Sequence, residues 1–263
     1  MCQNCVNCWN SERTISSQAL ETRKVQRLKN LINPEGNPVG DKKMLNKHKR
    51  SLILALALGD GCLHYIRNAG NLYGGLTIDH GMAQADYQSW KAKLLSSIFN
   101  KEVKMRPGHK GQSVQVSICA KRLRAWRKFT YPNNRKSVPK MLKYIMHPEF
   151  AFNIWMMDDG YVEPGMYNKK LVSATMRLFI NSQTDEEAAE IVKWLNSNFD
   201  ISARILYQKS RGKKQPFIKF NQQDSLKLWH IMRLFVLQFK SMQHKFRHIE
   251  SIYQIKFLQR TTE

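Results

Sequence analysis

The feature that most constrains the fold is a pair of apolar segments, each ending in an acid and a glycine. They are residues 51–61 (SLILALALGDG) and residues 152–160 (FNIWMMDDG). Leu, Ala and Met favour helices, and glycine often ends one, so two buried helices are expected. Asp60 and Asp159 then lie at helix C-termini, where the dipole is negative and a carboxylate favours a nearby cation. A divalent metal held by carboxylate and carbonyl oxygens would meet that need.

The elements after each apolar segment repeat in the same order. In the first half we expect helices at 85–100, 120–129 and 141–146, and strands at 63–67, 73–79, 103–106 and 113–119. In the second half we expect strands at 172–181, 201–208 and 215–220, and helices at 185–199 and 225–239. Asp60 precedes Phe99 by 39 residues and Asp159 precedes Phe199 by 40. These patterns predict an α+β fold made of a duplicated αββαββα unit, with helices on one face of each antiparallel sheet.

The chain divides into four predicted segments. They are a basic N-terminal arm at 1–45, a first subdomain at 46–147, a second subdomain at 148–250 and a C-terminal tail at 251–263. The arm carries Cys2, Cys5 and Cys8. Zinc usually takes four ligands and no partner cluster follows, so metal binding and a simple thiol-bearing tail both stay open.

The charge balance indicates a polyanionic partner. The 263 residues include 43 Lys plus Arg against 20 Asp plus Glu, a net charge of +23, and 42% are hydrophobic. A chain with this apolar content can bury a core, and a folded protein this basic usually meets nucleic acid. The sequence has no apolar run of about 20 residues, so no membrane span is expected. The first ten residues lack a secretory signal pattern, which favours an intracellular protein.

Both apolar segments resemble the signature of the LAGLIDADG homing endonucleases, at residues 53–61 (ILALALGDG) and 152–160 (FNIWMMDDG). Residues 136–139 (KSVP) before the second copy are also similar to single-chain members, and the resemblance spans about residues 46–250. It implies that the signature helices pack at the centre of a pseudo-twofold saddle, with two sheets lying in the DNA major groove. The implied activity is sequence-specific cleavage of double-stranded DNA by a monomeric, intron-encoded endonuclease that uses Mg²⁺.

The resemblance also implies site residues. The last acid of each signature binds metal, here Asp60 and Asp159, and the main-chain oxygens of Gly59 and Asp158 help to hold it. The implied catalytic lysines, which would stabilise charge on the phosphate, are Lys136 and Lys245. The polar strand residues near the metals are Asp79 and Asn181. Their unlike chemistry predicts unequal half-sites.

Basic and polar residues of the strands and turns form the predicted DNA-binding set. Its members are Arg67, Lys104, Arg106, Lys110, Gln115, Ser117, Arg177, Arg204, Lys209, Arg211, Lys213, Lys214 and Lys219. Strand positions such as Gln115 and Ser117 would face bases, and turn lysines would face phosphates. If about eight cations neutralise phosphates, affinity falls by several orders of magnitude over a modest rise in salt.

Two alternatives remain beside the endonuclease. The first is an intron maturase that binds intron RNA on the same fold, and the second is a non-catalytic DNA-binding regulator. Retention of Asp60 and Asp159 favours cleavage over both. The habits of the resembled family place such a protein in a mitochondrion, a chloroplast or the bacterial cytoplasm.

Overall fold

The computed structural model describes residues 42–68, 70–108, 111–210 and 212–261. Nearly all of the predicted arm lies outside the described residues, including Cys2, Cys5 and Cys8, and so do Lys110 and Arg211. Within the described ranges, no helix has the length and apolar character needed to cross a bilayer.

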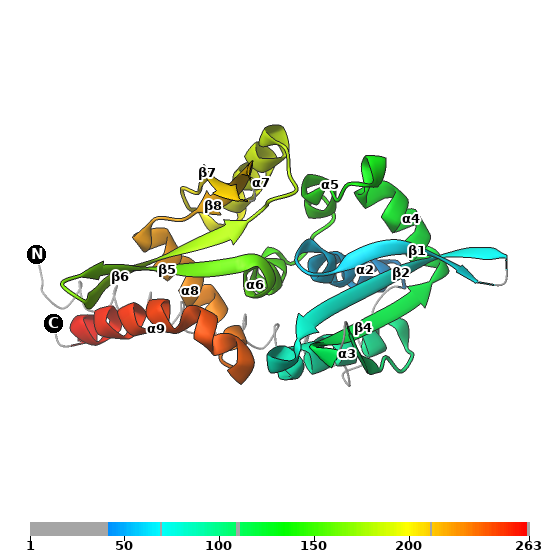
Figure 1. Ribbon diagram of the computed structural model, residues 1–263, viewed down its shortest axis with the longest axis horizontal. Coiled ribbons are helices and arrows are strands. Elements are labelled where there is room, and N and C mark those ends of the chain that lie inside the picture. Colours follow the sequence, from blue (N-terminus) through cyan, green and yellow to red (C-terminus); the bar gives the residue numbers. More distant parts are fainter. Residues whose placement is uncertain (1–41, 69, 109–110, 211, 262–263) are drawn as a thin grey trace, which may run out of the picture. The chain divides into compact units, whose positions relative to one another are not determined.

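The first half runs from one apolar helix to the next (Figure 1). Its elements are α2 (Lys42–Leu58), β1 (Cys62–Asn68), β2 (Asn71–Gly81), η1 (Met82–Gln84), α3 (Ala85–Phe99), β3 (Met105–Pro107), β4 (Ser113–Ala120), α4 (Lys121–Thr130), η3 (Pro132–Asn134) and α5 (Val138–Leu142). The second half repeats the order with α6 (Pro148–Asp159), β5 (Gly160–Tyr167), β6 (Lys170–Phe179), α7 (Asp185–Phe199), β7 (Arg204–Ser210), β8 (Lys213–Lys219), α8 (Gln222–Val236) and α9 (Lys240–Thr261).

Each half forms one antiparallel four-stranded sheet, in the orders β1-β2-β4-β3 and β5-β6-β8-β7. Alternate residues of the strands are buried, as in β2, where Leu76 and Ile78 are fully covered and Asp79 is exposed. This alternation leaves one face of each sheet apolar and packed on helices, and the other polar and open. The predicted α+β fold, with its duplicated order and two antiparallel sheets, is confirmed.

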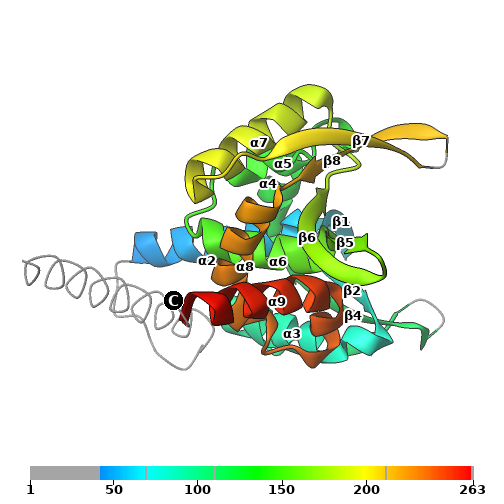
Figure 2. The same cartoon turned by 90° about the vertical axis from the view of Figure 1, so that its left-hand side faces the viewer.

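Helices α2 and α6 pack against each other, side by side in both views (Figures 1 and 2). Residues 52–58 of α2 and 150–157 of α6 are all buried. A helix that is apolar on every side is stable only when protein surrounds it, which explains why these two segments lack a polar face. Each half therefore contributes its most apolar segment to the shared core.

Several predicted boundaries were wrong. The helix expected at 141–146 is α5 (Val138–Leu142), because Pro139 fits the first turn of a helix, where no amide hydrogen is needed. Strand β3 (Met105–Pro107) begins later than the strand expected at 103–106. The boundary placed at residue 250 falls inside α9 (Lys240–Thr261), which lies along β5 and β6 (Figure 1).

Candidate functional site

Both motif helices end in a glycine that the geometry requires. A Cβ on Gly61 would overlap the carbonyl oxygen of Leu56, and one on Gly160 would overlap that of Met156. Neither glycine has a positive φ, so close approach of the backbone, rather than a left-handed cap, selects glycine here. Helix α6 runs directly into β5, and only residues 59–61 separate α2 from β1, so Asp60 and Asp159 lie at equivalent helix ends.

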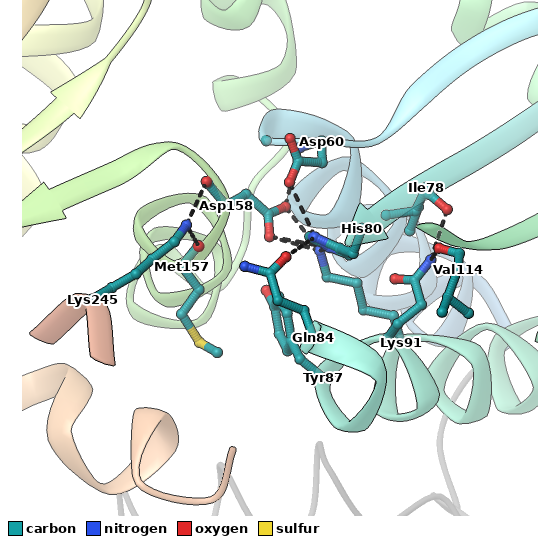
Figure 3. Close-up of polar contacts among 12 residues, drawn as sticks. Asp60, Ile78, His80, Gln84, Tyr87, Lys91, Val114, Met157, Asp158 and Lys245 are labelled. Atoms are coloured by element: carbon teal, nitrogen blue, oxygen red, sulfur yellow. Dashed lines mark hydrogen bonds and ion pairs between the residues drawn. The ribbon is translucent and has the colours of Figure 1, made fainter. Parts of the chain in front are cut away.

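Each predicted catalytic lysine reaches the end of its own motif helix. Lys136 Nζ donates to the carbonyl oxygen of Gly59 at 2.6 Å. Lys245 Nζ donates to the carbonyl oxygens of Met157 at 2.7 Å and Asp158 at 3.1 Å (Figure 3). Burial lowers the pKa of both ammonium groups, and the nearby acids oppose that shift. The predicted lysines and the predicted carbonyl ligands thus lie in direct contact, in matching arrangements.

The two metal-ligand candidates share a crowded negative environment. Burial, followed by repulsion from Asp158, raises the pKa of Asp60 to about 6, although its side chain keeps 37% of its surface and water offsets part of the effect. Burial, followed by repulsion from Asp158 and Asp60, raises the pKa of Asp159 to about 7. Repulsion from Asp60 contributes to the raised pKa of Asp159, and Asp158 acts on both acids. Such a pair gains most from a bound cation.

Asp158 has a different environment from its neighbour Asp159. Its side chain is completely buried, and both carboxylate oxygens accept hydrogen bonds from Lys91 Nζ, at 2.7 and 2.9 Å (Figure 3). Burial alone would raise the pKa of Asp158, but Lys91 and His80 hold it below its usual value. The sequence did not predict this ion pair, because a lysine in an amphipathic helix normally faces solvent.

His80 joins the motif-helix ends from strand β2. Its Nδ1 lies 3.3 Å from Asp60 Oδ2 and 3.1 Å from Gln84 Oε1, and its Nε2 lies 2.8 Å from Lys91 Nζ. Donor atoms of Asp60, His80 and Asp158 lie within 4.8 Å of one another, as in a metal site. The Lys91 ammonium already satisfies Asp158, however, so this cluster is internally neutralised. Sequence reasoning missed His80, although its position two residues after the buried Ile78 marks it as a polar side chain facing the core.

A cavity of about 210 Å³ opens beside Asp159. Its lining includes Gly59 from the other motif helix, Lys136 and Asn181. The structure therefore brings together Asp159 and two predicted catalytic residues, Lys136 and Asn181, from distant parts of the chain.

Asp79 is not equivalent to Asn181 in the fold. Cys62 and Tyr161 each follow a motif acid by two residues, and they pair with Thr77 and Arg177. Counting two residues onward, Asp79 corresponds to Phe179, so the assumed correspondence with Asn181 was wrong by two positions. Asp79 is exposed on the polar face of its sheet, and its carboxylate has no hydrogen bond or ion pair with another described residue.

The predicted DNA-binding residues divide between two sheet faces. Strand pairing places these on the open faces: Arg106, Gln115, Ser117, Arg177, Arg204, Lys213 and Lys219. Arg67, Lys209 and Lys214 have the opposite strand parity, and Lys104 precedes β3. In the second sheet, Glu163 on β5 accepts hydrogen bonds from Arg177 Nε and Lys219 Nζ, both at 3.0 Å.

Comparison with known proteins agrees with this architecture. The model of the LAGLIDADG DNA endonuclease family matches residues 50–228. The solved structure of "the homing endonuclease I-WcaI bound to its DNA recognition sequence" is 19% identical and covers 81% of this chain and 97% of its own, with a TM-score of 0.52. The I-LtrWI LAGLIDADG homing endonuclease bound to target DNA is 8% identical and covers 81% and 92%, with a TM-score of 0.50. Both structures share the fold. No curated protein matches the sequence.

Proposed function

Because this chain belongs to the LAGLIDADG DNA endonuclease family, we propose that it cuts both strands of a specific DNA site with divalent cations held by Asp60 and Asp159. The observation that carries this proposal is the meeting of the two motif helices, where burial, and then repulsion from neighbouring carboxylates, raises the pKa of Asp60 and of Asp159. An arrangement that concentrates negative charge in a partly buried site is costly for a protein unless a cation binds there.

The residues present fit Mg²⁺. Hard divalent cations prefer carboxylate and carbonyl oxygens, which Asp60, Asp159, Gly59 and Asp158 offer at the two helix ends. The Asp158 carboxylate does not belong to this set, because Lys91 already binds both of its oxygens. The ammonium groups on the Gly59 and Asp158 carbonyls mark positions where positive charge is favourable.

The side chains around the acids support phosphodiester hydrolysis. When bound, the divalent cations activate water and stabilise the leaving oxygen. Asp60 and Asp159 act as ionised carboxylates, and they orient the groups that they bind. Lys136 and Lys245 hold their positive charges beside the acids, where they stabilise the additional negative charge on the attacked phosphate. Asn181 lines the cavity beside Asp159, and its amide would hydrogen-bond a phosphate oxygen or water there.

The open faces of the two sheets form the proposed DNA interface. Antiparallel strands enter the major groove of B-DNA, where each base pair presents a distinct pattern of donors and acceptors. Polar strand residues such as Gln115 and Ser117 face bases, and basic residues such as Arg204 hold phosphates. One chain carries both half-sites, so the protein acts as a monomer on an asymmetric target. We further propose that its gene lies in an intron and that the target is the intron-free allele.

A cleavage assay tests this function. The purified protein is incubated with a plasmid that carries the joined sequences flanking the gene's insertion point, with Mg²⁺ or with EDTA. We expect one double-strand break with Mg²⁺ and none with EDTA. Tight, sequence-specific binding without cleavage in Mg²⁺ or Mn²⁺ would instead support a DNA-binding regulator. Tighter binding to the intron transcript than to the DNA, without cleavage, would support a maturase.

A further inference from the structure

The contact between the motif helices contains a buried polar cluster that belongs to only one half-site. Asp158 reaches from α6 toward the first half, where it meets Lys91 from α3 and His80 from β2 (Figure 3). Lys91 is completely buried, and His80 is 5% exposed. The Lys91 ammonium also lies 4.3 Å from the centre of the Tyr87 ring. Three ionisable groups this deep in a core are costly unless each has partners, and here each does.

The chain has uncharged residues at the positions equivalent to this cluster. Helices α3 and α7 are both 15 residues long, and each begins 100 residues from the other, so Lys91 corresponds to Ile191. The strand register likewise makes His80 correspond to Ile180, and the motif alignment makes Asp158 correspond to Gly59. Ile180 and Ile191 are both buried. The fold therefore does not need this cluster for packing, because its own second half lacks it.

The cluster holds Asp60 at two points. Asp158 Oδ2 accepts a hydrogen bond from the main-chain amide of Asp60 at 3.1 Å, which fixes the backbone. When Lys91 donates to Nε2 of a neutral His80, the ring proton is on Nδ1, which faces Gln84 Oε1 and Asp60 Oδ2. The imidazole thus contacts the carboxylate that we assign to the metal. Asp159 instead faces the cavity beside Lys136.

We infer that Lys91 and His80 are positioning residues that hold Asp60 in place. Lys91 acts through Asp158, and His80 acts directly. Because Asp159 has no equivalent cluster among the described residues, loss of this cluster affects cleavage of the two DNA strands unequally. This inference rests on the proposed endonuclease function. Lys91 takes no part in a chemical step, because it is completely buried. The cluster fixes the orientation of the Asp60 carboxylate, and small displacements of a catalytic group produce large losses in rate.

The decisive variant removes both charges together. Lys91→Met alone would leave the Asp158 carboxylate buried and unpaired, which is strongly destabilising and can prevent folding. Lys91→Met combined with Asp158→Ala replaces the pair with apolar groups, an exchange that is often neutral for stability. Ile191→Met is the matched control, since it changes the equivalent α7 position without touching a polar contact. His80→Ile copies the second half, and His80→Gln restores a polar side chain.

Two measurements on folded protein test the inference. The first is hydrogen exchange at the Asp60 amide in the DNA-free protein, and the second is single-turnover cleavage of target DNA labelled separately on each strand. In the double variant we expect Asp60 amide exchange to accelerate at least tenfold. We also expect the ratio of the two strand-cleavage rates to shift about tenfold, with the same direction in His80→Ile and partial rescue in His80→Gln.

Unchanged exchange at Asp60, or equal slowing of both strands, would overturn the positioning role. A shift as large in Ile191→Met would also overturn it, because that variant perturbs only packing. Suppose that wild-type protein cuts no DNA, but Asp60 amide exchange still accelerates in the double variant. That result would refute the endonuclease function and the strand dependence, and it would confirm that the cluster holds Asp60. The two failures are therefore distinguishable.

Discussion

The side chain of Asp158 fills the space that a side chain on Gly59 would need. A Cβ built on Gly59 would lie 2.8 Å from Asp158 Cγ and would overlap its Cβ and one carboxylate oxygen. These are equivalent positions in the two motif helices, and they meet where the helices cross. Only one of them can carry a side chain, so the interface is asymmetric at its centre. The buried Lys91 and His80 follow from that choice, because the carboxylate needs partners.

Substitution of Gly59 should therefore damage the interface. We expect Gly59→Ala to lower the free energy of unfolding by about 1–3 kcal/mol, the usual cost of overpacking a core, and to slow DNA cleavage. Gly81→Ala is the control, since a Cβ there meets no atom within 4 Å. Thermal unfolding followed by circular dichroism measures both. Equal melting temperatures for the two variants would contradict the close contact of Gly59 with Asp158.

Lys136 and Lys245 should act on chemistry more than on DNA binding. Replacing either with Met removes a positive charge beside the acids, so we expect the cleavage rate to fall by about 10²–10³-fold. DNA affinity, measured by fluorescence anisotropy in Ca²⁺, should change much less. Lys143→Met, at an exposed lysine between α5 and α6, should leave the rate near that of wild type. A loss of rate explained entirely by weaker binding would show that these lysines only attract DNA.

The raised pKa values of the two acids predict how metal-free protein responds to pH. Asp159 has a pKa of about 7 in the folded protein and an ordinary value of 3.8, so the folded state binds its proton more tightly than the unfolded state. The contribution of Asp159 to stability should therefore fall as pH rises from about 4 to 7 and then level off, whereas His80, whose pKa burial lowers to about 4, acts in the opposite direction in wild type and variant alike. Asp159→Asn does not lose stability in this way. In EDTA its melting temperature should therefore be several degrees above that of wild type at pH 8 and nearly equal to it at pH 4.

Adding Mg²⁺ supplies the control for this prediction. A cation that binds only the folded state raises its stability, so Mg²⁺ should raise the melting temperature of wild type more than that of Asp159→Asn. A variant that is less stable than wild type at pH 8 in EDTA would mean that the ionised carboxylate stabilises the fold instead of straining it.

Glu163 should restrain the basic face of the second sheet. Its carboxylate binds Arg177 and Lys219. The hydrogen bond from Arg177 is the main cause that keeps the pKa of Glu163 low; burial opposes it, and the hydrogen bond from Lys219 adds to it. Glu163→Gln frees these cations, so we expect several-fold tighter binding to non-target DNA and a steeper salt dependence, by about one unit of slope. Glu190→Gln removes the same charge at an exposed site on α7 and should change both less. Equal effects in both variants would indicate a purely long-range charge effect.

Local signals explain which elements the sequence predicted well. Helix α7 begins and ends where expected, because Thr184 and Glu187 form a capping box that marks its start. Strand β5 was not predicted as a separate strand, since Pro164 and Gly165 weaken its pattern, and the proline is tolerated because β5 is an edge strand. Helix α9 has charged residues distributed around its axis, so its sequence shows little of the periodicity that predicts a packed helix.

The candidate site also contains residues that the sequence could predict and one contact that it could not. Asp60 and Asp159 could be assigned from the repeated motif and the two lysines from the family resemblance, and the structure brings each lysine to its own helix end. The partnership of Lys91 with Asp158 could not, because it joins residues 67 positions apart in sequence through a buried contact that no local pattern encodes.

The most direct test of the shared two-carboxylate centre is single-turnover cleavage of the target DNA in Mg²⁺ by wild type, Asp60→Asn and Asp159→Asn. Asp200→Asn, at a fully exposed acid paired with Lys227, is the control. We predict that each motif variant binds the target with near wild-type affinity but cuts it at least about 10³-fold more slowly, while Asp200→Asn cuts normally. Cleavage of both strands at the wild-type rate by either motif variant would contradict the account.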